Sequence, residues 1–419
     1  MQSISPEILD IGCRARAAAR LMATLPGRLR QQALAAMAGK LTAAKVQILE
    51  ANRCDLAAAR QNGLEGPLLK RLEISEKVFA YMRDRLTEAA ALPDPVGRIL
   101  EGHTRPNGLH VERISVPIGV IGIIYESRPN VTADSAGLCF KTSNAVILRG
   151  GKEAMNSNLA IVTTMVEGGT KKGLPRNAIQ FITTTDREAI RELVQLEGRV
   201  DLAIPRGGEA LIRSVTEHAR IPVIKHYKGV CHTYIDESAN LDMALAVAEN
   251  AKCQRPGVCN ALETLLVHEK VAGTFLPRLA ARFTERGVEL RGCPVSRKIV
   301  PEMKEATEDD WYAEYLDLIL AVRVVPSVKA AVEHINRYGS HHSDAIIAES
   351  KTATAMFTQE VDSATVYVNA STRFTDGGEF GMGAEIGIST DKLHARGPMG
   401  LEELTTYKYV IYGNGQIRQ

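Results

Sequence analysis

The sequence predicts an α/β protein in which helices alternate with the strands of parallel sheets. Three observations support this fold class. Residues 6–92 are almost entirely helix-like and rich in Ala, Leu, Arg and Glu. From Val116 onward, short apolar runs alternate with helix-like stretches, which is the pattern of a doubly wound sheet. A second α/β unit follows the segment around Cys259.

The helical region has breaks near Pro26-Gly27 and between Gly63 and Pro67, and it ends in the segment 92–97. Residues 98–115 are polar and β-leaning, with Pro106-Asn107-Gly108 near their centre. Asn-Gly is a strong signal for a tight turn between two strands. This stretch therefore predicts a β-hairpin.

The first α/β unit contains short apolar runs that indicate strands and stretches with helical character between them. The expected strands are 119–125, 145–148, 178–182, 200–204 and 222–225. The expected helices are 131–142, 158–168 and 186–196, with a further helix opened by Gly207-Gly208. This order predicts parallel strands joined by crossover helices.

The second unit repeats the alternation. The expected strands are 262–267, 317–325, 344–348 and 366–369, and the expected helices are 240–252, 271–286 and 328–338. A Gly-rich loop at 377–387 and a β-like tail at 405–412 close the chain. Such an exposed β edge, together with the hairpin, is more safely paired with another copy than left bare. We therefore expect a homo-oligomer, either a dimer or a tetramer.

Composition excludes several classes of protein. The chain has 419 residues, enough for two or three domains, with 45% hydrophobic and 24% charged residues and a formal net charge of +2. This balance predicts neither nucleic-acid nor membrane partners. No secretory signal is expected, because Glu7, Asp10 and several arginines interrupt the first 19 residues. Seven irregularly spaced cysteines favour a reducing compartment, so we expect a cytoplasmic protein.

Cys259 is the leading candidate for a catalytic nucleophile. It follows Pro256 and Gly257, which end the helix 240–252, and it precedes an apolar strand. A substrate can reach a thiol in such a loop, and Arg255 would favour its thiolate. The alternative is a small hydrophobic residue in a loop. Cys253 competes, although it falls at the end of the helix.

The segment 125–131 ends a strand and begins a helix, where ligands bind in doubly wound sheets. The amide of Asn130 could donate to a developing oxyanion, and Arg128 could meet an anionic group. The alternatives are a helix cap for Asn130 and a solvated surface position for Arg128.

Arg149 and Lys152 flank two glycines after the next strand, and this pair suits the 2′-phosphate of NADPH. No G-x-G-x-x-G motif follows a strand, so a dinucleotide would bind in a non-standard way. An ordinary glycine turn with a charged rim is the alternative. Gly207 and Gly208 suggest a turn that faces a phosphate. His341 and His342 are interpreted as loop residues, and no metal is expected.

Together, the segments 116–130, 225–229, 254–260 and 377–387 resemble the γ-glutamyl phosphate reductases, a branch of the aldehyde dehydrogenase superfamily. The resemblance covers nearly the whole chain and implies an aldehyde dehydrogenase-like fold. It places a Rossmann-type cofactor domain at 1–97 plus 113–229 and a second α/β catalytic domain with the nucleophile at 230–363. A small β oligomerisation element with the Gly-rich loop would comprise 98–112 plus 364–419.

The resemblance implies reduction of L-glutamate 5-phosphate by NADPH to L-glutamate 5-semialdehyde and phosphate, the second step of proline biosynthesis. Cys259 would form a thioester, and Asn130 would share an oxyanion hole with the backbone N–H of the cysteine. Arg149 matches a lysine that faces the adenine ribose, and Gly207 and Gly208 fall where the helix beside the phosphates begins. Glu314 aligns with a glutamate that holds the nicotinamide ribose, although the Phe-Gly-Pro that usually follows is absent.

One departure from the wider superfamily favours reduction. Oxidising relatives place a glutamate base in a Glu-Leu-Gly-Gly segment, whereas this chain has Lys-His-Tyr-Lys-Gly at 225–229. Without that carboxylate, water is not activated against the thioester. His226 is a candidate proton donor, with a structural role as the alternative. Arg128, Lys225 and Arg255 are candidates for binding the substrate phosphate and α-carboxylate.

Two other functions remain open at this point. An aldehyde dehydrogenase working in the oxidising direction would need no phosphate, and a non-catalytic nucleotide-binding protein would not need Cys259. In longer relatives a glutamate kinase domain precedes this one. A separate glutamate 5-kinase is therefore the expected upstream enzyme, and contact with it is a hypothesis.

Overall fold

The structure, a computed structural model, describes residues 4–418. These residues form two compact units. The first comprises residues 4–225, 381–387 and 399–418, and the second comprises 226–380 and 388–398.

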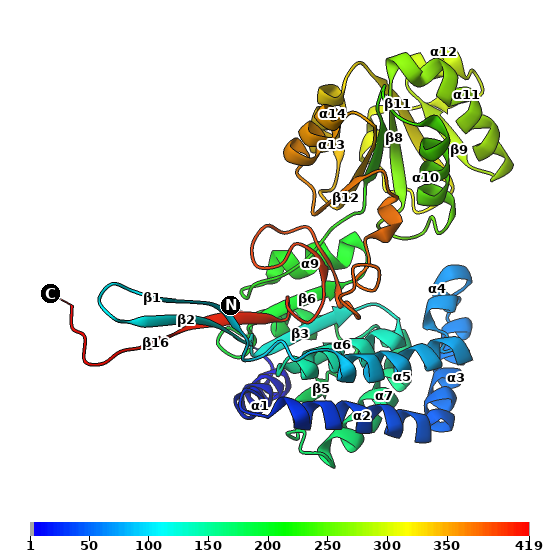
Figure 1. The fold of residues 1–419 in the computed structure, drawn as a ribbon. Helices are drawn as coiled ribbons and strands as arrows, with labels where there is room; N and C mark the ends of the chain where they lie inside the picture. Colours follow the sequence, from blue (N-terminus) through cyan, green and yellow to red (C-terminus); the bar gives the residue numbers. More distant parts are fainter. Residues whose placement is uncertain (1–3, 419) are drawn as a thin grey trace. The chain divides into compact units, whose positions relative to one another are not determined.

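A four-stranded parallel sheet in the order β5-β4-β3-β6 forms the centre of the first unit (Figure 1). Its strands are β3 (Val120–Tyr125), β4 (Ala145–Arg149), β5 (Ile179–Phe181) and β6 (Leu202–Arg206). Nearly every residue in them is buried, because helices cover both faces of such a sheet. The expected strand 222–225 is reduced to one bridge between Val223 and Ala203.

Helices of the first unit pack around this sheet and against one another. They are α1 (Pro6–Met22), α2 (Gly27–Ala43), α3 (Lys45–Gln61), α4 (Gly66–Leu72), α5 (Glu76–Ala91), α6 (Pro129–Lys141), α7 (Met155–Thr170), α8 (Glu188–Leu193) and α9 (Glu209–His218), with a 3-10 turn η1 (Lys152–Ala154). The closest packing is between α2 and α7. A Cβ on Gly168 would lie 2.8 Å from the carbonyl oxygen of Ala36, so glycine permits this approach.

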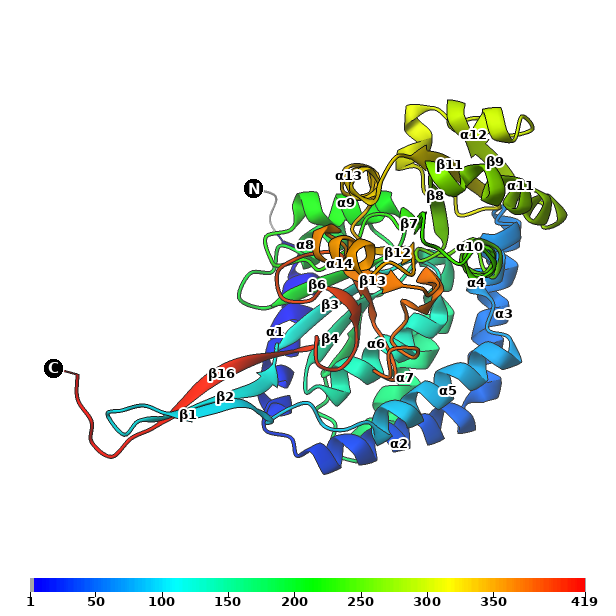
Figure 2. The ribbon, with the colours of Figure 1, turned by 45° about the horizontal axis from the view of Figure 1, so that its top comes forward.

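A three-stranded antiparallel sheet extends from the first unit as an arm, which Figures 1 and 2 both show. It contains β1 (Ile99–Thr104), β2 (His110–Pro117) and β16 (Thr405–Tyr412), with β2 in the centre. The predicted hairpin is confirmed, and Gly108 in its turn has a φ of 87°. Most side chains of β1 and β16 are exposed.

A seven-stranded parallel sheet forms the second unit, in the order β10-β9-β11-β8-β7-β12-β13. Its strands are β7 (Cys231–Ile235), β8 (Leu262–His268), β9 (Glu289–Gly292), β10 (Lys304–Glu305), β11 (Ile319–Val325), β12 (Ser343–Ile347) and β13 (Thr365–Val368). The helices are α10 (Leu241–Cys253), α11 (Glu269–Glu285), α12 (Pro294–Ile299), α13 (Val328–Tyr338) and α14 (Lys351–Glu360), with 3-10 turns η2 (Glu308–Tyr312) and η3 (Thr372–Phe374).

The two faces of this sheet bury separate cores. Leu265 and Val267 of β8 face α10 and α11, whereas Leu266 between them faces α13 and α14. This alternation is the period of two that a strand imposes. Figure 1 shows the two pairs of helices on opposite sides of the sheet.

The boundaries differ from the expected domains in two places. Residues 364–419 were assigned to a β element, but β13 pairs with β12 inside the sheet of the second unit. The boundary between the first unit and the second falls after Lys225 rather than after Gly229. The strands β7 and β9 had no predicted counterpart, and β14 (Gly387–Ser389) and β15 (Gly397–Met399) form a separate two-stranded sheet. Among the described residues, none of the helices combines the length and apolar character required to cross a membrane.

Candidate active site

The loop that carries Cys259 joins α10 to β8. The side chain of Asn240 caps α10 as predicted, accepting hydrogen bonds from the backbone N–H groups of Asp242 at 3.1 Å and Met243 at 3.0 Å. The helix ends at Cys253, before Pro256 and Gly257. Cys259 is partly exposed, while Asn260 after it is buried. The thiol of Cys259 is therefore accessible, while the burial of Asn260 anchors the loop directly after it.

The site lies at the amino ends of three neighbouring strands. Cys259 precedes β8, the segment from His226 to Gly229 precedes β7, and His342 directly precedes β12. These strands are adjacent in the order β8-β7-β12. Because parallel neighbours begin at the same edge of a sheet, residues far apart in the sequence meet there.

Two residues hold the backbone of Cys259. A Cβ on Gly229 would lie 1.8 Å from the carbonyl oxygen of Cys259, so only glycine fits at this contact. The thiol of Cys231 donates to the same carbonyl oxygen at 3.2 Å. Burial raises the pKa of Cys231 well above its usual value, so this thiol keeps its proton and remains a donor.

The segment around η3 holds Asn260. The hydroxyl of Thr372 donates to the Asn260 carbonyl oxygen at 2.7 Å, and the Asn260 amide donates to the Thr375 carbonyl oxygen at 2.9 Å. The guanidinium of Arg373 donates to the Asn260 side-chain oxygen. Burial lowers the pKa of Arg373, as does nearby Arg255, whereas Cys259 raises it. Arg373 therefore brings a positive charge near the thiol, and sequence reasoning missed it.

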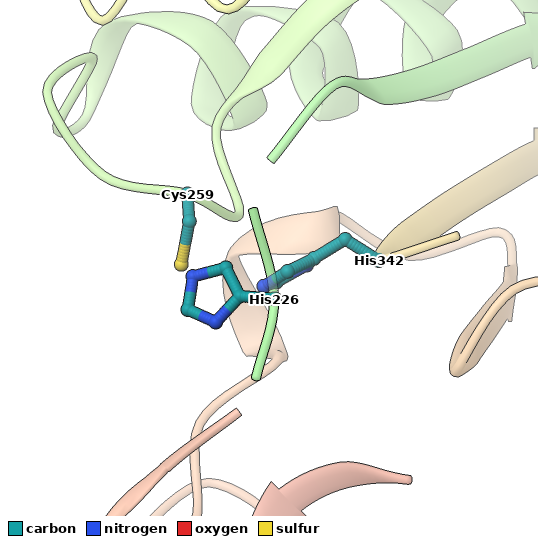
Figure 3. Close-up of side chains that lie close together, drawn as sticks. All are labelled: His226, Cys259 and His342. Carbon is teal, nitrogen blue, oxygen red and sulfur yellow. The ribbon is translucent and has the colours of Figure 1, made fainter. Parts of the chain in front are cut away.

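His226 and His342 lie beside the thiol. One ligand-type atom from each of Cys259, His226 and His342 lies within 4.8 Å of the other two. Figure 3 shows a ring nitrogen of His226 turned toward the sulfur of Cys259. The other ring nitrogen, Nδ1, lies 2.9 Å from the carbonyl oxygen of Ile388, and this contact fixes the orientation of the ring. A carbonyl oxygen only accepts, so Nδ1 carries a hydrogen, and in the neutral form of the ring the lone pair is on Nε2.

His342 is in a loop, as interpreted from the sequence, but it is fully buried in the site. Burial lowers the pKa of His342 to about 3, and the proximity of His226 acts in the same direction. Its ring is therefore neutral near pH 7. The rings of His226 and His342 meet edge to face, with centroids 5.5 Å apart.

Glu314 accepts a hydrogen bond from the backbone N–H of Gly229 at 2.8 Å. It thereby supports the segment that contacts Cys259. Its expected contact with a nicotinamide ribose stays a prediction. Arg255 is exposed on the same loop as Cys259, and Lys225 is the last residue of the first unit before the chain enters the second. Their expected roles toward the substrate also stay predictions.

The first unit contains a cavity of about 500 Å³ at the carboxyl ends of β3 and β4. Its cationic lining residues are Arg149, Lys152, Arg187 and Arg191. Arg149 donates to the carbonyl oxygen of Gly150 at 2.5 Å and to that of Thr185 at 3.2 Å. Its buried Nε has no hydrogen-bond partner among the described residues. This donor set fits an anionic group of a dinucleotide.

Gly208 is the N-cap residue of α9, as predicted for the helix that Gly207-Gly208 opens. Its N–H donates to Glu126 at 2.7 Å, and a Cβ on Gly207 would lie 2.8 Å from the same side chain. The glycines therefore allow a close approach at this helix start. Their binding of a phosphate stays a prediction.

Asn130 lies in the first turn of α6, directly after Pro129. The alternative of a helix cap is wrong, because Arg128 occupies the N-cap position without a side-chain cap bond. The Asn130 amide donates to Asp134 at 3.4 Å. Burial raises the pKa of Asp134 to about 7, and the hydrogen bond from Asn130 partly counteracts this. Asn130 and Cys259 belong to different units, so their joint oxyanion hole stays a prediction.

Residues 5–291 match the model of the aldehyde dehydrogenase family. The chain belongs to the aldehyde dehydrogenase family. Within this family, it is 56% identical over 417 residues to the γ-glutamyl phosphate reductase of Moorella thermoacetica, covering 100% of both chains. The resemblance noted from the sequence is therefore confirmed.

Solved aldehyde dehydrogenase folds agree with this result. The γ-glutamyl phosphate reductase of Thermotoga maritima superposes with a TM-score of 0.97 at 47% identity, over 99% of this chain and 100% of that one. Glyceraldehyde-3-phosphate dehydrogenase of Methanocaldococcus jannaschii, solved in complex with NADP, gives a TM-score of 0.69 at 14% identity, over 97% of this chain and 94% of that one. The second likeness supports the fold alone. Aldehyde dehydrogenases use a nicotinamide cofactor, as the expected Rossmann-type domain requires.

Proposed function

We propose that the protein reduces L-glutamate 5-phosphate to L-glutamate 5-semialdehyde and phosphate, using NADPH and a thioester on Cys259. The observation that carries the chemistry is the accessible thiol with the lone pair of His226 turned toward it. The substrate is supported by the full-length identity of 56% to a γ-glutamyl phosphate reductase. An activated acyl phosphate is a suitable substrate for a thiolate, because phosphate is a good leaving group.

The residues of the site account for the first half of the reaction. Neutral His226 accepts the proton of Cys259, and the thiolate attacks the γ-carbonyl carbon. The C–S bond forms, the C–O bond to phosphate breaks, and phosphate leaves as the anion. The Cys259 backbone N–H and the Asn130 amide would stabilise the oxyanion, and one such donor is worth about 3 kcal/mol in the transition state.

The nicotinamide cofactor, when bound, supplies the hydride that reduces the thioester carbonyl. Collapse of the resulting thiohemiacetal releases aldehyde and restores the thiol. His226, whose ring nitrogen is turned toward the sulfur, would return the proton. Residues 225–229 contain no carboxylate that could activate water, so the thioester survives until it is reduced. This favours the reductase over the oxidising alternative.

Preference for NADPH over NADH rests on the cavity of the first unit. Arg149, Lys152 and Arg187 line it, and cationic side chains suit a 2′-phosphate. Fluorescence titration of both reduced cofactors tests this preference, and equal affinities would contradict it.

The decisive experiment is oxidation of pyrroline-5-carboxylate, the cyclised product, with NADP in the presence and absence of phosphate. We expect oxidation only with phosphate or arsenate. Cys259→Ala should lower the rate at least about 10³-fold, because no thioester forms. Cys253→Ala, at the end of α10, is the matched control and should keep its activity. Oxidation without phosphate would support the oxidising alternative, and an active Cys259→Ala variant would remove the covalent mechanism.

We also propose that the arm mediates homo-oligomerisation. Tyr407, Tyr409 and Ile411 alternate along one face of β16 and are all more than half exposed. An exposed apolar edge strand is normally covered by a partner, and a second copy supplies an identical strand. Light scattering would reveal a mass above one chain, which Tyr409→Lys/Ile411→Lys should lower. A wild-type monomer would contradict this proposal.

A cytoplasmic location is supported by the seven free cysteines, since thiols persist in reducing compartments. Contact with glutamate 5-kinase remains a hypothesis. A pull-down with this protein under native conditions tests the contact, and repeated absence of the kinase from the recovered material would count against it.

A further inference from the structure

The thiol and the two imidazoles have the composition of a zinc site. In the described part of the chain, His226, Cys259 and His342 are the one group of three or more such side chains whose ligand atoms converge within 4.8 Å. Thiolate and imidazole are the ligands that Zn²⁺ prefers, whereas Mg²⁺ and Ca²⁺ prefer oxygen. The expectation of no metal rested on the absence of ligand spacing in the sequence. The fold supplies the convergence instead.

His342 supplies the first geometric feature that points to a metal. It is fully buried, and its Nε2 has no hydrogen-bond partner among the described residues. Its Nδ1 lies 2.9 Å from the hydroxyl of Ser343. A buried polar atom with no partner costs free energy, and a bound ion would remove this cost.

His226 has the second feature of a metal ligand. Its Nδ1–H donates to the carbonyl oxygen of Ile388, which fixes the tautomer and makes Nε2 the lone-pair nitrogen of the neutral ring. Ligating histidines typically donate their other ring N–H to a carbonyl or carboxylate in this way. Cys259 is only partly buried, so an ion can reach it from solvent. Zinc bond lengths of about 2.0–2.3 Å at tetrahedral angles place ligand atoms about 3.3–3.6 Å apart. Because the ligand atoms lie within 4.8 Å of one another, a contraction of at most about 1.5 Å would suffice.

We propose that Zn²⁺ binds Cys259 Sγ, His226 Nε2 and His342 Nε2 and reversibly blocks the nucleophile. The Zn–S bond forms as the thiol proton leaves to solvent, and no oxidation or reduction takes place. Water completes the tetrahedron on the solvent side. The inhibitory effect rests on the proposed function, whereas the binding site does not. Zinc and an acyl donor compete for the same sulfur, so each should exclude the other.

Binding is tested with Co²⁺ as a spectroscopic substitute for zinc. The full chain is treated with EDTA, dialysed and titrated with Co²⁺, and then with Zn²⁺. We expect one equivalent to bind, with a thiolate-to-cobalt charge-transfer absorption that Zn²⁺ abolishes. Cys259→Ser should lack this absorption. Zn²⁺ should also slow alkylation of Cys259 by iodoacetamide, whereas Mg²⁺ should not.

The matched pair of variants uses neighbouring histidines. His342→Leu removes a proposed ligand and should weaken zinc binding at least about 100-fold, since even indirect contacts of metal ligands are worth 10- to 100-fold. His341→Asn changes a histidine outside the group, and Asn tolerates its φ of 60°. It should bind zinc like the wild type. If His342→Leu does not fold, as judged by circular dichroism, His226→Ala serves the same purpose at a partly exposed position.

In the activity assay, micromolar Zn²⁺ should inhibit the phosphate-dependent reaction, and EDTA should restore the activity. Prior acylation of Cys259 should protect the enzyme from inhibition by Zn²⁺. No charge-transfer absorption in the wild type, or unchanged zinc affinity in the ligand variant, would overturn the zinc site. An absorption without phosphate-dependent activity would leave the site in place and remove the proposed function. Phosphate-dependent activity without the absorption would support the proposed function and overturn the zinc site.

Discussion

At the residue scale, glycine at position 229 permits a close backbone contact with Cys259. The backbone of Gly229 lies against the carbonyl of Cys259, and no side chain fits between them. Its N–H is held by Glu314, and Cys231 donates to the same Cys259 carbonyl. The position of Cys259, the proposed nucleophile, therefore depends on the packing and hydrogen bonds of these residues.

Gly229→Ala should displace the Cys259 loop without unfolding the protein. The new Cβ would lie 1.8 Å from the Cys259 carbonyl oxygen and 2.5 Å from its Cα, so the loop must move by about 1 Å or more. A misplacement of this size costs about 10²-fold in rate. We expect kcat to fall by that factor while the circular dichroism spectrum stays unchanged.

Gly257→Ala is the matched control, because it lies in the Cys259 loop itself. A Cβ there would meet only the Leu316 carbonyl oxygen, at an ordinary 3.6 Å. Its activity should stay within about threefold of the wild type. Equal effects of the two substitutions would show that the loop responds to lost flexibility rather than to the contact at Gly229.

At the scale of elements, a buried ion pair joins α10 to β8 on either side of the Cys259 loop. The ammonium of Lys252 lies 2.6 Å from Glu263, and both side chains are 0% exposed. Burial raises the pKa of Glu263 to about 7, and the charge of Lys252 counteracts this. Glu263 also accepts from the backbone N–H of Leu316 at 3.2 Å. The pair thus fixes both ends of the loop and the segment that leads to β11.

Lys252→Met should destabilise the second unit by about 3–5 kcal/mol, because it leaves a carboxylate buried without its partner. Urea denaturation measures this change. Adding Glu263→Gln should recover most of the loss, since the amide is neutral and keeps an acceptor for Leu316.

The surface pair of Arg278 and Asp242, which joins α11 to α10, is the control. Arg278→Ala should change stability by less than about 1 kcal/mol, because exposed ion pairs contribute little. A Lys252→Met variant as stable as Arg278→Ala would mean that Glu263 is already protonated in the native protein.

At the scale of the molecule, stability should fall in mild acid because the second unit buries neutral histidines. Burial lowers the pKa of His334 from 6.5 to about 2, and the nearby His232, Arg323 and Arg337 act in the same direction. Between these values the unfolded chain binds a proton that the native protein does not. The free energy of unfolding therefore rises with pH between these two values. As the pH falls below 6.5, this contribution to stability decreases.

His334→Phe should remove the difference in proton binding between the unfolded and native states that His334 causes. Between pH 6.5 and 4.5, its free energy of unfolding should depend on pH less steeply than that of the wild type, by about 1.4 kcal/mol per pH unit. The chain has one tryptophan, Trp311, whose ring centroid lies 5.5 Å from that of His334, so its fluorescence reports unfolding of this unit. Parallel curves for the two proteins would show that His334 is protonated in the native state.

Much of the fold could be predicted from local patterns. The helix 328–338 and the strand 405–412 were predicted with the bounds observed, since apolar periodicity and turn residues mark them directly. The strand 222–225 was wrong, because an apolar run alone does not show whether a neighbour pairs along its length. The four residues of β13 were placed in the wrong unit for a related reason. Strand partners in a parallel sheet are distant in the sequence.

The sequence by itself determined the Cys259 loop, because a capped helix, Pro256-Gly257 and an apolar strand are all encoded within a few residues of one another. Only the tertiary structure decided what surrounds the thiol. Gly229, His342 and Arg373 are separated from Cys259 by 30 to 114 residues. The order of β8, β7 and β12 aligns the beginnings of these strands, and η3 folds back onto the loop. A sequence pattern with a short period carries no record of that order.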